Sequence, residues 1–229
     1  RRLVNDKADY IRAVCGLYEA YSENDTIVAG GISIPMLRQQ KKSEKDEYLC
    51  LSDFIAPVTS GKKDYIGAFA VTAGFGAEEL LKVFEADEDE YAALLLKSLL
   101  ERLAEAATEW LHYMIRTEYW GFAADEKLSI ADMLASRFRG IRPAVGYPSI
   151  PDQTMNFLLH DMLRTEEIGI TLTENGMMNP PASVSGFVFA HPRSKYFVIG
   201  PLSEDQFNDY AVRRNVDKEM IRKFLSANL

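Results

Sequence analysis

A long segment without glycine or proline carries apolar side chains at helical spacing, and this limits the folds open to the chain. Between residues 77 and 118 the apolar positions recur every three or four residues, a pattern typical of an amphipathic helix. Asp87 and Asp89 suit its first turn, where carboxylates face the positive end of the helix dipole. A helix of ~30 residues rises ~45 Å, so we expect it to be the structural spine. Its predicted inner stripe is Tyr91, Leu94, Leu95, Leu99, Leu103, Ala106, Ala107, Trp110 and Met114.

Shorter segments on either side predict a mixed chain. Helical spacing favours helices over residues 5–21, from Ser129 onward, after Pro151, and over 203–229 in two pieces. Ser129 and Asp132 have the spacing of a capping box, and Asn215 is a fair N-cap for the last piece. Short apolar runs predict strands over residues 48–56, 65–72, 168–172, 184–190 and 196–199. Strands before and after a helical middle indicate an α+β fold.

Composition excludes several classes of function. The 229 residues carry a net charge of −8, which disfavours binding to nucleic acid or to an anionic membrane surface. No apolar run approaches the ~20 residues of a membrane-spanning helix, and the first residues lack the pattern of a signal peptide. Cys15 and Cys50 are expected to be reduced, buried thiols. We therefore predict a cytoplasmic protein.

The residues suggest neither a conventional catalytic site nor a metal site. The chain has three histidines, and His112 and His160 are expected to be ordinary residues on helix faces. His191 precedes a proline in a loop. No cluster of His, Cys and carboxylates has the spacing of a metal site, and no phosphate-binding loop occurs. We predict no catalytic residue and no metal.

The most informative segment is the loop over residues 140–151, which holds three prolines and two glycines. Proline excludes regular helix and central strand here, so a rigid, extended loop is expected. Gly146 can adopt backbone angles closed to other residues. Arg142 offers a planar fork suited to a carboxylate. From composition alone, a surface or interdomain salt bridge remains open for Arg142.

The motif Arg142-Pro-Ala-Val-Gly146-Tyr147 resembles the Arg-x-x-x-Gly-Tyr motif of the activation domain of cobalamin-dependent methionine synthase. Further blocks resemble the same family in the same order, from about Leu37 to the C-terminus. They are LSDFIAP (51–57), SGKKDYIGAFAVTAG (60–74), RLAEA (102–106), YWG (119–121), LTEN (172–175), PPASVSG (180–186), HPRSKYF (191–197) and DYAVRR (209–214).

The resemblance implies a single α+β domain with a twisted antiparallel sheet and a long central helix. It also implies a function in the reductive methylation that repairs methionine synthase. In the family this domain binds S-adenosylmethionine in an extended groove. An electron from a flavodoxin-type donor and the methyl group of S-adenosylmethionine restore methylcobalamin from inactive cob(II)alamin. The cobalamin is carried by a separate module, so that module is the expected partner.

Site residues follow from the matched motif positions. The resemblance assigns Asp53 to the α-amino group of the ligand and Arg142 to its carboxylate. Glu105 is a further acidic contact. Ala144, Gly146 and Tyr196 belong to the S-adenosylmethionine site, and Tyr147 faces the cobalamin. Each residue also has a structural alternative: Asp53 as a turn cap, Glu105 as a solvated helix residue and Tyr196 as core.

Two departures from the family pattern remain. Residues 1–36 match no motif, so we predict an unmatched N-terminal helical segment over 1–36 and an S-adenosylmethionine-binding activation domain over 37–229. Phe197 stands where relatives usually carry a second tyrosine, so any polar contact of that hydroxyl is lost. Two other functions stay open: reactivation of another corrinoid methyltransferase, or a docking domain without turnover. An independent methyltransferase would need no cobalamin.

Overall fold

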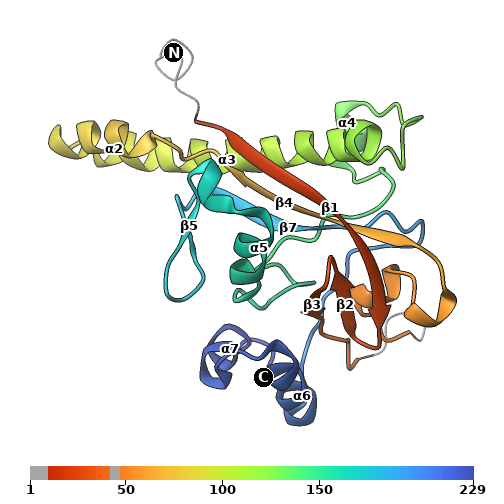
Figure 1. Cartoon of the computed structure of the whole chain (residues 1–229). Helices are drawn as coiled ribbons and strands as arrows, with labels where there is room; N and C mark the ends of the chain where they lie inside the picture. Colours follow the sequence, from red (N-terminus) through yellow and green to blue (C-terminus); the bar gives the residue numbers. More distant parts are fainter. Residues whose placement is uncertain (1–9, 42–46) are drawn as a thin grey trace.

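A five-stranded antiparallel sheet forms the centre of the molecule, and a long helix crosses one of its faces (Figure 1). The computed structural model describes residues 10–41 and 47–229. The strand order is β3-β2-β1-β4-β7. The strands are β1 (Arg12–Glu23), β2 (Thr26–Ala29), β3 (Ile32–Pro35), β4 (Asp64–Thr72) and β7 (Ser183–Val188), and a separate hairpin pairs β5 (Thr171–Leu172) with β6 (Met178–Asn179).

Helices cover both faces of this sheet and one end of the molecule (Figure 1). The α-helices are α2 (Ala77–Ala86), α3 (Glu90–Met114), α4 (Ile130–Leu134), α5 (Met155–Leu163), α6 (Glu204–Arg214) and α7 (Lys218–Phe224). Short helical turns are η1 (Leu51–Phe54), η2 (Val58–Ser60) and η4 (Thr165–Ile168), and η3 (Ile115–Tyr119) is a π-helical continuation of α3. No helix in the described ranges is long and apolar enough to cross a membrane.

The predicted helix over residues 5–21 is wrong for the part that the structure describes. Arg12–Glu23 is a strand, paired with β4 from Arg12↔Thr72 to Ala20↔Asp64. From Tyr18 to Glu23 its side chains alternate between covered and exposed, as expected for a strand with one buried face. The apolar residues follow helical spacing, and Leu17 and Tyr21 are exposed in the strand. Pairing with β4, more than 40 residues away, therefore overrides the local pattern. Residues 1–9 lie outside the described part.

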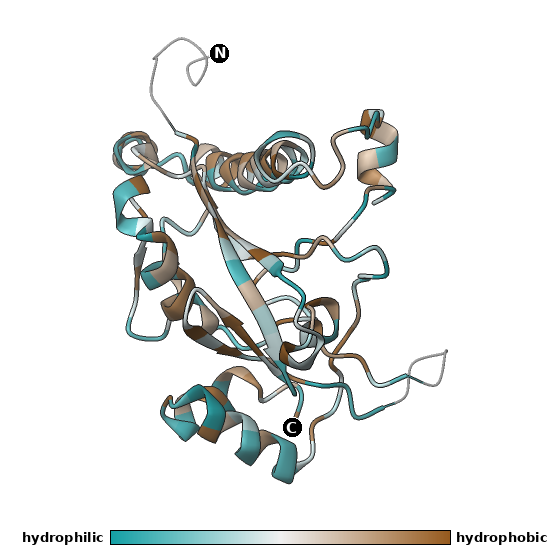
Figure 2. Cartoon of the chain, turned by 45° about the vertical axis from the view of Figure 1, so that its right-hand side comes forward, coloured by the Kyte–Doolittle hydropathy of each residue, from teal (hydrophilic) through white to brown (hydrophobic). Residues whose placement is uncertain are grey.

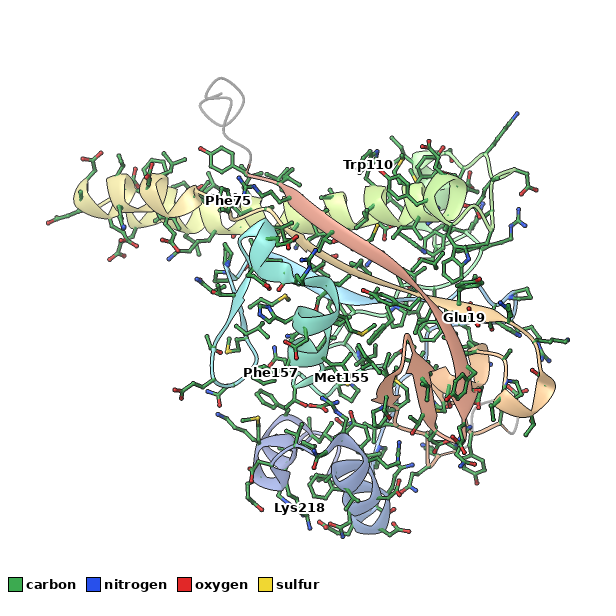
Figure 3. All side chains as sticks on the ribbon, viewed as in Figure 1. Glu19, Phe75, Trp110, Met155, Phe157 and Lys218 are labelled. Atoms are coloured by element: carbon green, nitrogen blue, oxygen red, sulfur yellow. The ribbon has the colours of Figure 1, made fainter. Side chains whose placement is uncertain are left out.

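Strand β4 explains why the sheet needs a helix on each face. Its residues from Ile66 to Thr72 are all buried. On one face Ala68 and Ala70 join the core that includes Met155 of α5, labelled in Figure 3. On the other face Phe69 packs with Leu111 of α3. A strand that is covered on both sides carries a continuous apolar run, which is why residues 65–72 are predictable as a strand. In Figure 2 the long helix above the sheet carries both brown and teal segments, as expected for a helix with one covered face.

The predicted spine helix is confirmed as α3. Asp89 is its N-cap and accepts a hydrogen bond from Ala92 N at 2.9 Å. The 25 residues of α3 rise about 38 Å. Its inner face was misplaced, however: Leu94 and Leu95 are 64% and 58% exposed. The buried residues are instead Ala93, Leu96, Leu100, Ala104, Thr108, Leu111 and His112.

Other local predictions have mixed outcomes. The capping box of Ser129 and Asp132 begins α4, and residues 140–151 contain neither helix nor regular strand, as expected. Residues 204–224 form two helices, but Asn215 ends α6 in a left-handed conformation and Asp217 is the N-cap of α7. Residues 48–56 and 196–199 are not strands. The first segment contains the turn η1, because Asp53 bonds back to the backbone N–H of Cys50.

Candidate functional site

The loop over residues 141–150 lies directly against β7, and a glycine makes this approach possible. Val145 N–H donates to Ser185 O at 2.9 Å, and Phe187 N–H donates to Pro143 O at 3.1 Å. A Cβ on Gly186 would lie 2.3 Å from Pro143 O and 2.8 Å from the Cα of Ala144. Both distances are far inside van der Waals contact, so a side chain at position 186 would push the loop away from the sheet.

The other end of the loop is tied to residues 196–199. Gly146 has φ +85° and donates its N–H to Ile150 O at 2.8 Å, which closes a tight turn. The carbonyl of Pro148 accepts from Ile199 N–H at 3.0 Å, and the hydroxyl of Ser149 donates to Phe197 O. The loop is therefore held on two sides, and the position of Arg142 is fixed by the backbone around it.

A cavity of about 400 Å³ opens between this loop, α3 and residues 196–198. Five of the predicted site residues line it: Glu105, Arg142, Ala144, Tyr147 and Tyr196. Gly146 belongs to the turn beside it. The sequence analysis missed Glu109, Ser136 and Phe138, which also line the cavity. Glu109 lies four residues after Glu105 on α3, so the helical period itself places both on one face.

Arg142 is the most constrained charge in the cavity. Its side chain is only 14% exposed, and its Nη2 group donates to Oε1 of Glu109 in an ion pair. Its backbone N–H donates to the hydroxyl of Tyr196 at 2.9 Å. Burial raises the pKa of Tyr196, so this hydroxyl stays protonated. Arg142 thus forms a salt bridge, but inside the cavity and not on the surface or between domains as the composition had left open.

A second carboxylate of the cavity interacts with Tyr147. The hydroxyl of Tyr147 donates to Oε1 of Glu105 at 2.8 Å. This hydrogen bond, with some burial, raises the pKa of Tyr147. The tyrosine remains 51% exposed, which leaves part of its side chain open to a partner at the mouth of the cavity.

A cluster of buried polar groups lies behind the cavity wall. His112 is 1% exposed and meets Arg116 at 2.8 Å between Nδ1 and Nη1. Arg116 is fully buried, and its Nε donates to Glu126 at 2.9 Å. Burial and the two arginines 116 and 142 hold the pKa of His112 well below its ordinary value. His112 is therefore a neutral interior residue and not the ordinary helix-face residue expected from the sequence.

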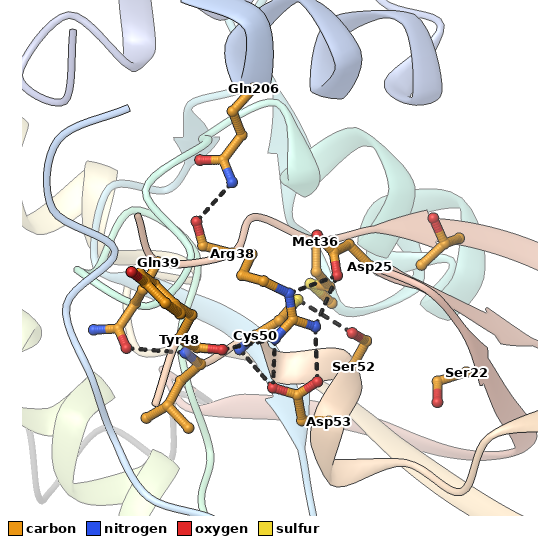
Figure 4. Close-up of polar contacts among 12 residues, drawn as sticks. Ser22, Asp25, Met36, Arg38, Gln39, Tyr48, Cys50, Ser52, Asp53 and Gln206 are labelled. Carbon is orange, nitrogen blue, oxygen red and sulfur yellow. Dashed lines mark hydrogen bonds and ion pairs between the residues drawn. The ribbon is translucent and has the colours of Figure 1, made fainter. Parts of the chain in front are cut away.

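Asp53 lies elsewhere. Its two carboxylate oxygens accept from Arg38 at 2.8 and 2.9 Å, and Oδ2 also accepts from Cys50 N–H at 2.9 Å (Figure 4). It lines a different cavity, of about 580 Å³, together with Tyr48, Phe54, His191, Arg193 and Lys195. Residues 191–198 contribute to both cavities: His191, Arg193 and Lys195 to this one, and Tyr196, Phe197 and Val198 to the other. Asp53 and Arg142 thus do not share one cavity.

Arg38 is a residue that sequence reasoning missed. It pairs with Asp25 as well as Asp53, and its contacts come from segments far apart along the chain (Figure 4). No motif signals it.

The cysteine thiols are free, and burial raises the pKa of Cys50 to about 11. Within residues 10–41 and 47–229, no group of three or more His, Cys, Asp or Glu side chains is placed to hold a metal ion.

Comparison with known proteins settles the family. The sequence profile described as "Vitamin B12 dependent methionine synthase, activation domain" matches residues 1–215. The chain belongs to this family. The matched range includes residues 1–36, which the sequence analysis predicts to be an unmatched segment. The fold is similar to a crystal structure of the MetH reactivation domain bound to AdoHcy, with a TM-score of 0.91 and 40% identity.

The similarity to that reactivation domain extends over most of both chains, covering 96% of this chain and 70% of the other. The expected α+β fold, with a twisted antiparallel sheet and a long helix, is confirmed. This chain is therefore a reactivation module of a methyltransferase, methionine synthase.

Proposed function

We propose that the chain binds S-adenosylmethionine and presents its methyl group to cob(II)alamin carried by a partner module, for reductive reactivation of methionine synthase. The single observation that carries the proposal is the cavity built around Arg142, in a fold similar to a reactivation domain bound to AdoHcy. A flavodoxin-type protein is the proposed electron donor. The isolated domain is proposed to bind the ligand without turnover.

The charges of the cavity suit this ligand. S-adenosylmethionine carries a carboxylate, an ammonium and a sulfonium, so its net charge is positive. Glu105, Glu109 and Arg142 line the cavity, so its carboxylates outnumber its guanidinium group. Opposite net charge favours the cationic methyl donor. Arg142 would receive the ligand carboxylate, and Ala144 and Tyr196 would line the nucleoside.

The position of Asp53 makes its proposed contact more demanding. The α-amino group and the carboxylate of the ligand are bonded to the same carbon atom, so a ligand held by both Asp53 and Arg142 must place that carbon beside residues 191–198, which contribute to both cavities. The Asp53 carboxylate must also accept from the α-amino group while held by Arg38. Because a carboxylate has about four acceptor positions, these contacts are compatible. Asp53 therefore stays the proposed partner of the α-amino group, and Asp53→Asn tests it.

The proposed chemistry asks little of this chain beyond positioning. Cobalamin, when brought by the partner module, supplies the cobalt that accepts the methyl group. The methyl on a sulfonium is already activated, so this chain needs to hold it in place rather than supply an acid or a base. Tyr147, half exposed at the mouth of the cavity, is the proposed contact with the corrin. Its hydrogen bond to Glu105 would keep the ring in position.

Calorimetry with the isolated chain tests this proposal. We expect saturable binding of S-adenosylmethionine, and at least about tenfold weaker binding by Arg142→Ala, because one charge-assisted contact contributes about 1.5–3 kcal/mol. Arg137→Ala is a matched control, since Arg137 is an exposed arginine that pairs with Asp132. A second assay supplies a cob(II)alamin-loaded partner module and a reductant, and measures methyl transfer to the cobalamin. Absence of binding, or equal affinity in both variants, contradicts the proposal.

A further inference from the structure

We propose that Glu109 is a positioning residue for Arg142: it holds Nη2 of the guanidinium and so orients this group toward a ligand carboxylate in the cavity. The inference rests on the proposed function, in which Arg142 receives the carboxylate of S-adenosylmethionine. Glu109 itself would not contact the ligand. It acts through Arg142 alone.

The geometry of the pair supports this division. Nη2 of Arg142 donates to Oε1 of Glu109, and both side chains line the cavity. Across the part of the chain that the structure describes, Arg142 Nε and Glu109 Oε2 are among the few buried side-chain atoms without a hydrogen-bond partner. A guanidinium can offer Nε–H and Nη2–H together to one carboxylate. Glu109 accepts from the second of these donors, and because Nε is buried as well, the ligand carboxylate would meet the guanidinium at Nη1.

A buried guanidinium at this place needs a counter-ion even before a ligand arrives. Arg142 is 14% exposed. Both Arg142 and Arg116 lie close enough to the buried His112 to lower the pKa of that histidine. Glu126 matches the charge of Arg116 at 2.9 Å. Glu109 does the same for Arg142. Removing one partner from such a pair leaves an uncompensated buried charge, so Arg142 would turn toward solvent.

The other nearby carboxylate does not replace Glu109 in this role. Glu105 accepts from the hydroxyl of Tyr147 at 2.8 Å, one helical turn away from Glu109. A four-residue step along α3 separates the Cβ atoms of the two residues by about 6 Å. Glu105 thus holds the tyrosine and Glu109 holds the arginine, and substitutions at the two positions should affect different steps.

The test is a calorimetric comparison of five proteins: the unaltered chain, Glu109→Ala, Glu109→Gln, Arg142→Ala and the double variant. S-adenosylmethionine is the ligand, and 5′-methylthioadenosine, which lacks the amino-acid end, is the control. We expect Glu109→Ala to weaken S-adenosylmethionine about tenfold or more. Glu109→Gln should lose less affinity than Glu109→Ala, because its amide oxygen still accepts from Nη2 although it supplies no counter-charge. Affinity for 5′-methylthioadenosine should not change.

The double variant separates positioning from direct contact. If Glu109 acts only through Arg142, the double variant binds S-adenosylmethionine as weakly as Arg142→Ala alone. An additional loss, or unchanged affinity in Glu109→Ala, overturns the inference. If Arg142→Ala itself keeps full affinity, the proposed function fails as well. Should Glu109→Ala not fold, Glu109→Leu replaces it: leucine fills a similar volume but accepts no hydrogen bond from Nη2, and undiminished affinity overturns the inference.

Discussion

Replacing Gly186 by alanine tests whether contact with β7 positions the Arg142 loop. The added Cβ would lie 2.3 Å from Pro143 O, 2.8 Å from the Cα of Ala144 and 3.0 Å from the ring of Phe69. Two of these three neighbours are backbone atoms, which cannot rotate away. Restoring ordinary contact therefore requires a shift of about 1 Å in the loop. The shift stretches the hydrogen bond from Phe187 N–H to Pro143 O, which is 3.1 Å long.

The expected magnitude follows from this crowding. Overpacking costs about 1–3 kcal/mol, and each weakened hydrogen bond adds about 0.5–1.5 kcal/mol. We expect Gly186→Ala to lower the free energy of unfolding by about 2–4 kcal/mol in urea titrations followed by circular dichroism. Affinity for S-adenosylmethionine should fall at least about tenfold at 15 °C, where the variant remains folded.

A second glycine gives the matched control. Gly61 ends η2 with φ +63°, and a Cβ there would meet no heavy atom within 4 Å. Gly61→Ala therefore introduces backbone strain of about 1–2 kcal/mol without moving the loop. We expect lower stability with unchanged affinity. If Gly186→Ala binds S-adenosylmethionine as tightly as this control, the contact with β7 does not position the site.

Three further substitutions test other parts of the structure. Since the pKa of His112 is lowered in the folded state, the unfolded chain binds the extra proton below pH 6.5 and stability falls with decreasing pH. In His112→Gln the free energy of unfolding should depend less on pH, by up to about 1.4 kcal/mol per pH unit, in urea titrations between pH 6.5 and 5. An unchanged slope contradicts the lowered pKa of His112. Asp152 is 1% exposed and paired with Arg214, so Asp152→Ala should lower the free energy of unfolding by about 3–5 kcal/mol. A loss below about 1 kcal/mol in the same titration argues against a buried pair. Tyr147→Phe removes the hydrogen bond to Glu105 and should change the free energy of unfolding by less than about 1 kcal/mol. Slower methyl transfer, with undiminished affinity for S-adenosylmethionine, supports a role of Tyr147 toward the corrin.

Features governed by neighbouring residues were predictable from the sequence. Asp89 begins α3 and Ser129 begins α4, because a cap depends on residues three positions away. Strand β4 was predictable from its continuous apolar run. Strand β1 was not, because its apolar residues follow helical spacing and pairing with the distant β4 overrides this local pattern. The exposed Leu94 shows the same limit: periodicity identifies a helix without saying which apolar face meets the core.

The candidate site divides in the same way. The loop motif predicted Arg142 and Tyr147, and helical spacing could have added Glu109. The pairing of Asp53 with Arg38 could not be inferred, since the contacts of Arg38 join residues 25, 48 and 53 through folding alone. The resemblance assigned Asp53 and Arg142 to one ligand. In the structure they line different cavities, to both of which residues 191–198 contribute.

A crystal structure of the chain with S-adenosylmethionine is the most direct test of how the ligand is held. We predict that a carboxylate oxygen of the ligand lies about 3 Å from the guanidinium of Arg142, with the nucleoside beside Ala144 and Tyr196. Electron density that places the amino-acid end away from Arg142, or the whole ligand outside this cavity, contradicts the account.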